Sequence, residues 1–517
     1  MKKKSNAAGT VGFIFIAMLM AKVLGQVREM VIAYSFGTAW QADAYVAASQ
    51  IPTNFFDMIL GSAVSAAFIP VFNKFMEKEG EGRARRFAGA FFNLIIIISA
   101  VLSVIGIVFA PQIIAVFTPG LGSEAAVLAA KLLKIMFLMV IFIGGAYTFV
   151  GILQSMGEYN LPAVMSMVSS GTCIIYLLTL EDKFGITGLA VSLLVGWMLQ
   201  FLILLPSVLQ KGLRPTAHIC DSGFIDVAKL ALPVLIGTWV QPVNVMVNTW
   251  IASSIPGGVS AINYSNRLYL IAAGVFAMSV TNYIFPKLSR LSIDEADKES
   301  WLNMFLSSLK TVLLVVTPMA VVFLTESKEI IRVIYQRGEF DEASVAVTGG
   351  ALLFYSIGIL PYALQEVMYK AFYSKRKSVV PMFVAMTGIV VNIILSFTLS
   401  GIMGINGLAL AASMSVIITA VISFVILTKN SGKVGRFLAG TVKIVISAVA
   451  SAAVILLVKP LMINFIGLDS FVSRTVVTCV SALAGCAVYG LLTLILRIPE
   501  VTGIVKMLLK KGETHEK

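Results

Sequence analysis

The chain has 517 residues, of which 58% are hydrophobic and only 13% charged, whereas soluble proteins carry about 25% charged residues. So little polar surface excludes an ordinary soluble globular protein. The net charge of +13 does not indicate nucleic acid, because the basic residues gather in short connections between apolar stretches. These stretches lack the alternation of barrel strands, so we expect an all-α polytopic membrane protein.

Fourteen apolar segments follow one another along the chain, each long enough to cross a bilayer of about 30 Å as a helix. They lie near residues 10–34, 40–75, 86–110, 124–155, 160–180, 185–209, 225–252, 257–288, 302–325, 342–372, 379–400, 404–428, 438–458 and 471–496. The first follows three lysines but lacks a small-residue cleavage site, so we interpret it as an uncleaved span. The sequence therefore predicts fourteen transmembrane helices.

Basic residues occupy alternate connections between these segments. They include Lys2, Lys3 and Lys4 and then gather within 74–86, 211–214, 287–298, 375–377, 429–436 and 506–511. The intervening connections 35–39, 111–123, 253–256 and 401–403 contain no Lys or Arg, although 326–342 is an exception with basic and acidic residues mixed. The positive-inside rule then predicts that both termini are cytoplasmic.

A repeated block divides the chain into two halves. FGITGLA at Phe184–Ala190 recurs as MGINGLA at Met403–Ala409, a shift of about 219 residues that also relates Pro162 to Pro381. The shift covers an even number of predicted helices, so both halves would have the same orientation in the membrane. We predict two parallel six-helix lobes around a central cavity, residues 1–215 and 216–430, plus two additional helices and a basic cytoplasmic tail in 431–517. This is the plan of a transporter.

Charged side chains inside the predicted spans are candidate functional residues, because each costs about 3 kcal/mol on insertion scales. Lys22 and Arg28 lie on the first predicted helix, Asp43 and Asp57 on the second, and Arg267 on the eighth. Cations from two lobes suit a phosphate-bearing ligand, since guanidinium groups bind phosphate oxygens in bidentate fashion. We predict a substrate site from these five residues. In a structural alternative, Asp43 pairs with Arg28 and holds the first two helices together. In the site itself, we expect Asp57 to pair with Lys22 while the site is empty, and a bound diphosphate would loosen that pair.

The sequence gives no pattern for a metal or catalytic centre. The two histidines, His218 and His515, lie in polar segments, and the four cysteines have no CxxC spacing. Neutral oxygen donors occur in three predicted spans, at Asn244, Asn248, Thr387, Asn392 and Ser415. A hard cation usually takes an anionic ligand as well, and Asp226 lies only at the start of its span, so we predict no metal and no cofactor.

Several motifs resemble a known family. They are AKVLGQVRE at Ala21–Glu29, ADAY at Ala42–Tyr45, AAFIP at Ala66–Pro70, NYSNRL at Asn263–Leu268 and YQRGEF at Tyr335–Phe340. As a set they are similar to the MurJ/MviN lipid II flippase family, in the multidrug/oligosaccharidyl-lipid/polysaccharide exporter superfamily. The resemblance extends across all fourteen predicted spans, including the last two.

The resemblance implies a flippase in the bacterial cytoplasmic (inner) membrane. Its substrate would be lipid II, the undecaprenyl-diphosphate-linked peptidoglycan precursor, moved from the cytoplasmic to the outer leaflet by alternating access of two lobes. Arg28 and Arg267 match cavity arginines thought to engage the diphosphate, Lys22 stands where the family usually has Arg, and Phe56 stands where Arg is common. Membrane lipids are implied partners and cell-wall synthesis proteins candidate ones, without nucleic acid.

Other functions stay open at this point. One is a flippase for another polyprenyl-linked glycan. Another is a cation-coupled multidrug exporter, which would predict twelve spans and an acidic, aromatic-lined cavity. A membrane-embedded transferase would need a catalytic carboxylate or metal in an outer loop, but the predicted outer loops are short, so we predict a transporter and not an enzyme.

Overall fold

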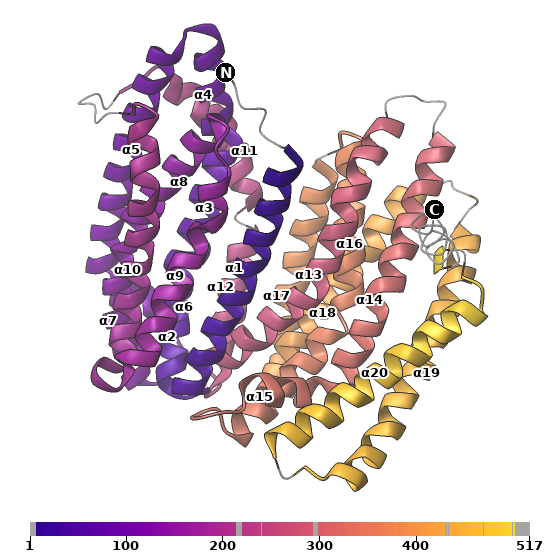
Figure 1. Cartoon of the computed structure of the whole chain (residues 1–517). Helices are drawn as coiled ribbons and strands as arrows, with labels where there is room; N and C mark the ends of the chain where they lie inside the picture. The colour runs from indigo at the N-terminus through magenta and orange to yellow at the C-terminus, as the bar shows by residue number, and fades with distance from the viewer. Residues whose placement is uncertain are drawn as a thin grey trace, which may run out of the picture. The chain divides into compact units, whose positions relative to one another are not determined.

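The computed structural model describes residues 7–501 except 214–219, 239, 293–297, 378, 430, 431, 433, 469 and 499. Within that part of the chain every regular element is a helix (Figure 1). The all-α class is therefore confirmed. The N-terminal lysines, Arg214, both histidines and the basic tail from residue 502 onward lie outside the described residues, so what the sequence predicts for them stays a prediction.

The first two predicted spans differ in regularity. The first is one helix, α1 (Ala7–Phe36), whereas the second is built of five pieces: α2 (Trp40–Gln50), η1 (Ile51–Asp57), α3 (Met58–Ala63), η2 (Val64–Phe68) and α4 (Ile69–Lys78). The η segments are π-helical. Pro52 lies in η1 and Pro70 is the second residue of α4, just after η2, and each lacks the backbone donor that a continuous helix requires. The wider π turns accommodate that loss and re-aim the helix.

The next helices are α5 (Glu81–Val108), α6 (Ala110–Phe117), α7 (Ser123–Phe137), α8 (Met139–Ser155), α9 (Asn160–Thr179), α10 (Glu181–Gln210), α11 (Gly223–Thr238) and α12 (Val240–Ala252). The chain continues with α13 (Gly258–Leu291), α14 (Lys298–Tyr335), α15 (Glu342–Ser356), α16 (Ile359–Ser374), α17 (Val379–Met403), α18 (Ile405–Thr428), α19 (Val434–Ile466) and α20 (Phe471–Ile495). Each of the fourteen apolar segments thus contains helix.

Nine helices of the described chain are long and apolar enough to cross a membrane, or ten if α15 and α16, bent by 46°, form one span. The second and seventh predicted spans are divided into helices of at most 16 residues, which are too short to count by themselves. The described helices therefore show a multi-pass membrane protein. The number fourteen stays a prediction.

The chain packs as two compact units. Unit 1 comprises Met1–Ser260 and Arg337–Asp341, and unit 2 comprises Ala261–Gln336 and Glu342–Lys517. The predicted lobe boundaries at residues 215 and 430 rest on the sequence repeat and stay predictions.

An aromatic cluster forms the core of unit 1 where η2, α4 and α5 meet. Phe68 lies 4.6 Å from Phe91 and 5.6 Å from Phe87 between ring centroids, and all three rings are buried. The π turn of η2 places Phe68 in this cluster, where aromatic packing stabilises the bend. The irregular second span is therefore anchored in the buried core of unit 1.

The start of α11 is fixed to the α4–α5 connection by ion pairs. Arg83 donates to both carboxylate oxygens of Asp221, at 2.7 and 2.8 Å, and its guanidinium lies 4.1 Å from the centre of the Phe75 ring. Lys74 Nζ donates to Asp226 at 2.7 Å. The bidentate geometry makes the Arg83 pair the more specific of the two.

The repeated sequence block adopts the same turn in each unit. Gly185, before the main part of α10, has φ 52° and ψ −148°, and Gly404, before α18, has φ 57° and ψ −132°. Only glycine adopts this backbone conformation without strain. The repeat found in the sequence therefore corresponds to a local structural repeat.

Replacing Gly404 tests this turn. Gly404→Ala should destabilise the protein by about 1–3 kcal/mol, because alanine is strained at this positive φ. Gly401→Ala is the matched control: its added methyl group meets no atom within 4 Å, and alanine favours the helix. Thermal unfolding in detergent should show a lower midpoint for Gly404→Ala only. Equal midpoints for the two variants would contradict the role of the turn.

Candidate functional site

The two buried charges of α1 form an ion pair. Arg28 Nη2 donates to Glu29 Oε1 at 2.9 Å, and the side chains are 17% and 5% exposed. Arg28 Nε is buried and has no hydrogen-bond partner among the described residues. A guanidinium has five N–H donors, so Arg28 keeps donor capacity for an anion while Glu29 offsets part of its charge.

Lys22 lies two turns before Arg28 on α1 and is exposed. Its neighbours Met20 and Val23 are also more than half exposed, at 52% and 54%. Lys22 and Glu29 are seven residues apart and share a face of the helix. This part of α1 therefore carries an exposed cation, six residues before the less exposed Arg28.

Asp43 at the start of α2 is buried and caps another helix. Its Oδ1 accepts hydrogen bonds from the backbone nitrogen and the hydroxyl of Ser260, at 2.8 and 2.7 Å, and Ser260 is the third residue of α13. A carboxylate at the N-terminus of a helix is stabilised by unpaired N–H groups and the helix dipole. In this structure Asp43 accepts from Ser260 and Arg28 pairs with Glu29, in place of the Asp43–Arg28 pair that was the structural alternative.

Further hydrogen bonds surround Asp43 within unit 1. The backbone nitrogen of Glu339 donates to the carbonyl of Tyr34 at 2.9 Å, and the backbone nitrogen of Gly120 donates to the Ser253 hydroxyl at 3.0 Å. We call the contacts of Tyr34, Asp43 and Gly120 with Glu339, Ser260 and Ser253 the polar seam. The polar seam joins the adjoining ends of α1 and α2 to three segments that are distant in the sequence.

The structure describes Arg267 and Phe56, whereas of Asp57 it describes only the backbone. Asp57 ends η1, but its side chain lies outside the described part, so its pairing with Lys22 stays a prediction. Arg267 is half-buried on α13, between the buried residues Ser265 and Leu268. Phe56 packs edge-on against Phe137 with ring centroids 6.1 Å apart. Convergence of Lys22, Arg28 and Arg267 on one cavity stays a prediction.

Two oxygen donors considered for a cation bond to backbone carbonyls, Ser415 to one on the neighbouring helix α17 and Thr387 to one within α17 itself. Ser415 donates to the Gly388 carbonyl at 2.6 Å, and Thr387 donates to the Phe383 carbonyl at 3.0 Å. Among the described residues, no group of three or more His, Cys, Asp and Glu side chains could hold a metal.

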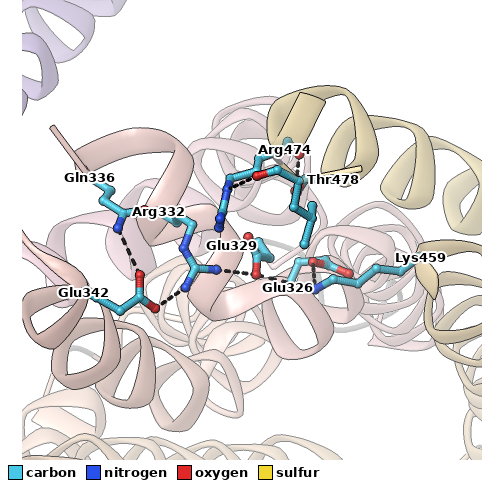
Figure 2. A network of polar contacts seen from close by, with 9 residues as sticks. Glu326, Glu329, Arg332, Gln336, Glu342, Lys459, Arg474 and Thr478 are labelled. Carbon is cyan, nitrogen blue, oxygen red and sulfur yellow. Dashed lines mark hydrogen bonds and ion pairs between the residues drawn. The ribbon is translucent and has the colours of Figure 1, made fainter. Parts of the chain in front are cut away.

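The sequence did not indicate a polar network in unit 2 (Figure 2). Lys459 of α19 pairs with Glu326 of α14 at 2.8 Å, and Arg332 bridges Glu329 and Glu342. The mixture of basic and acidic residues in 326–342 does not by itself predict these pairs. The available signal was Lys459, a lone cation in an apolar run, which requires a partner in lipid.

Comparisons with known proteins agree with one another. A family model described as lipid II flippase MurJ matches residues 32–478. The probable lipid II flippase MurJ of Treponema pallidum is 29% identical over 445 residues, covering 83% of each chain. The lipid II flippase MurJ of Burkholderia cenocepacia is 26% identical over 422 residues, covering 80% of this chain and 82% of that protein.

Solved structures are similar over most of the chain. A lipid II flippase MurJ in an inward closed conformation has a TM-score of 0.78 and 26% identity, covering 92% of this chain and 98% of that one. An inward-facing multidrug resistance transporter of the MATE family has a TM-score of 0.64 and 14% identity, covering 81% of this chain and 99% of that one. The second likeness shows the fold alone.

A double-mutant cycle tests the cap formed by Asp43. Asp43→Ala should cost about 1–3 kcal/mol of stability, because it leaves the Ser260 N–H and hydroxyl without their acceptor. Ser260→Ala should cost less, since the backbone N–H remains, and the double variant should cost less than the sum. Unfolding of the purified variants measures all three. Additive effects would contradict a direct Asp43–Ser260 contact.

Proposed function

The chain belongs to the lipid II flippase MurJ family, and from that premise we propose that it carries lipid II across the bacterial inner membrane. The observation that carries the proposal is the likeness to a solved MurJ over 92% of the chain, with a TM-score of 0.78. The multidrug transporter covers less of the chain at lower similarity. Transport breaks no covalent bond, so we assign no catalytic residue.

The proposed substrate is the undecaprenyl-diphosphate-linked precursor, and its diphosphate would bind Arg28, Arg267 and Lys22. Arg28 supports this assignment because its buried Nε has donor capacity left after pairing with Glu29. Asp43 and Asp57 belong to the proposed site as acidic neighbours that limit its positive potential. An acidic cavity, which a cation-coupled drug exporter requires, would have the opposite charge.

The proposed architecture has fourteen spans, with two parallel six-helix lobes and two additional helices, and both termini in the cytoplasm. Matching turns at Gly185 and Gly404 support the repeat on which the two lobes rest. The alternation of basic connections supports the orientation. Transport would then proceed from the cytoplasmic to the outer leaflet, where cell-wall synthesis proteins that use the precursor are proposed partners.

Alternating access requires contacts that break and re-form at low cost, and the polar seam suits this role. Asp43 holds the start of α13 through two hydrogen bonds, and Glu339 is held through one. Water can replace each of these bonds when the seam opens, so the net cost of opening is small compared with that of exposing an apolar interface. We therefore propose that the seam is intact in one transport state and open in the other.

Replacing the arginines tests the substrate site. Arg28→Ala and Arg267→Ala should each lower flipping in liposomes by about tenfold or more, because each removes charge-assisted hydrogen bonds to the diphosphate. Arg267→Lys should restore only part of the rate, since it returns the charge without the bidentate fork. Complementation of a flippase-depleted strain gives the same comparison in cells.

Two controls separate binding from folding. Arg290→Ala changes an exposed arginine on the same helix as Arg267 and should leave flipping unchanged. Arg28→Ala leaves the Glu29 carboxylate without its partner, which could destabilise the protein. The double variant Arg28→Ala/Glu29→Gln removes that charge as well, so it should fold normally and still fail to flip the substrate. Full growth with both arginines changed to alanine, at normal protein levels, would exclude the proposed site.

Cysteine labelling tests the orientation. In a background that keeps only native Cys220, Ser254→Cys should react with an impermeant thiol reagent from outside, because Ser254 is exposed on a predicted outer connection. Cys220 is exposed on a predicted cytoplasmic connection and serves as the internal control. Gly120 is a poor probe position, since an added Cβ would lie 2.4 Å from the Ser254 hydroxyl oxygen. Labelling of Cys220 but not of Ser254→Cys from outside would contradict the predicted orientation and indicate the opposite one.

A further inference from the structure

The helix α14 is irregular at two places. Pro318 lies inside it and has no N–H, so the carbonyl of Leu314, four residues earlier, loses its regular helical donor. Glu326 has φ −116° and ψ 16°, which are not helical values, and breaks the helix a second time. Inside a bilayer no water replaces the donor that Leu314 loses, and at Glu326, which is 1% exposed, the surrounding protein excludes water, so each break needs a compensating group from the protein.

The first break is compensated by α20. The Tyr489 hydroxyl donates to the Leu314 carbonyl at 2.9 Å, and Tyr489 is 5% exposed. The Thr317 side chain is a second polar neighbour of this hydroxyl. The Tyr489 hydroxyl therefore replaces the N–H donor that Pro318 lacks. It does so at the Leu314 carbonyl, which would have accepted from that N–H in a regular helix.

The second break is compensated by α19. Lys459 Nζ lies 2.8 Å from Glu326 Oε2 and 3.9 Å from Glu329 Oε1, and the Glu326 side chain is fully buried. A buried carboxylate without a cation would be strongly destabilising. Figure 2 shows Lys459 approaching from α19, with Arg332 on the other side of Glu329. The ammonium therefore stabilises the charge that sits on the broken turn.

A third contact lies nearer the start of α14. Lys310 Nζ is 3.9 Å from Glu500, which follows α20, and the Lys310 side chain packs over Gly440 of α19. From Lys310 to Glu329 a helix extends about 28 Å, close to the thickness of the hydrocarbon core. The α19–α20 pair thus follows α14 across the membrane and places a polar partner at each irregular point.

We propose that α19 and α20 act as a brace that fixes the two bends of α14, and that transport depends on these bends. Tyr489 and Lys459 are then positioning residues, which act through α14 and not on the substrate. Apolar packing alone would hold two helices together but would not place a donor at the carbonyl freed by Pro318 and a cation at the Glu326 turn. The link to transport rests on the proposed flippase function, whereas the brace itself does not.

The brace predicts that the effect of Tyr489 depends on Pro318. Tyr489→Phe should speed amide hydrogen exchange in the 314–322 part of α14 by about tenfold and lower lipid II flipping by a similar factor, because it leaves a buried carbonyl unpaired. Pro318→Ala returns the N–H to the helix, so adding Tyr489→Phe to it should change neither measurement further. Tyr159→Phe, at an exposed tyrosine, is the matched control.

Lys459 gives a second, independent comparison. Lys459→Met should impair exchange protection and flipping, because the buried Glu326 carboxylate loses its cation. Lys459→Met/Glu326→Gln should recover exchange protection, since position 326 then carries no charge and Glu329 keeps its pairing with Arg332. This pair keeps the brace testable if Tyr489→Phe folds poorly.

Two results would overturn the brace. One is unchanged exchange in α14 for Tyr489→Phe, and the other is an equal effect of Tyr489→Phe with proline and with alanine at position 318. Altered exchange with unchanged flipping would overturn the link to transport and leave the brace. Hydrogen exchange needs no substrate, so a wild-type protein that fails to flip lipid II would contradict the proposed function alone.

Discussion

The structure depends on one constraint: inside a bilayer, every backbone carbonyl and N–H group, and every charge, needs a partner from the protein. Long regular helices meet this requirement by themselves. Where α14 fails at Pro318 and Glu326, Tyr489 and Lys459 supply the partners. Where α13 begins, its free N–H groups meet the Asp43 carboxylate. The irregular points of this chain are therefore the points at which distant segments meet.

The same constraint separates two kinds of intramembrane charge. Glu326 and Asp43 are held by fixed partners within their own unit, which explains their burial by structure alone. Arg28 differs in the kind of group that is left over: its ion pair with Glu29 leaves a buried donor, Nε, without a partner in the described residues, whereas the unpartnered Oε1 of Glu326 is an acceptor. A cation with a spare donor suits an anionic ligand that comes and goes, whereas carboxylates that pair within the protein suit a structural contact or a gate.

Sequence reasoning predicted the helical class and the repeat because both depend on local patterns: apolar length, and glycines at Gly185 and Gly404 where only glycine fits. It did not predict the π turns of the second span, since the choice between a kink and a π turn depends on where Phe68 can pack. It missed the Glu326–Lys459 pair because the two residues are 133 positions apart. It offered Arg28 as an alternative partner for Asp43 because opposite charges on consecutive helices suggest a pair, whereas Asp43 bonds to Ser260, 217 positions away. Tertiary contacts decided both cases.

Transport of the lipid-linked precursor is the central claim, and reconstitution tests it most directly. The purified protein is placed in liposomes that contain labelled lipid II and, separately, another polyprenyl-linked glycan, and the fraction reaching the opposite leaflet is measured with time. The account predicts protein-dependent movement of lipid II that exceeds movement of the competing glycan. Equal movement of both, or movement of lipid II no faster than in protein-free liposomes, would contradict it.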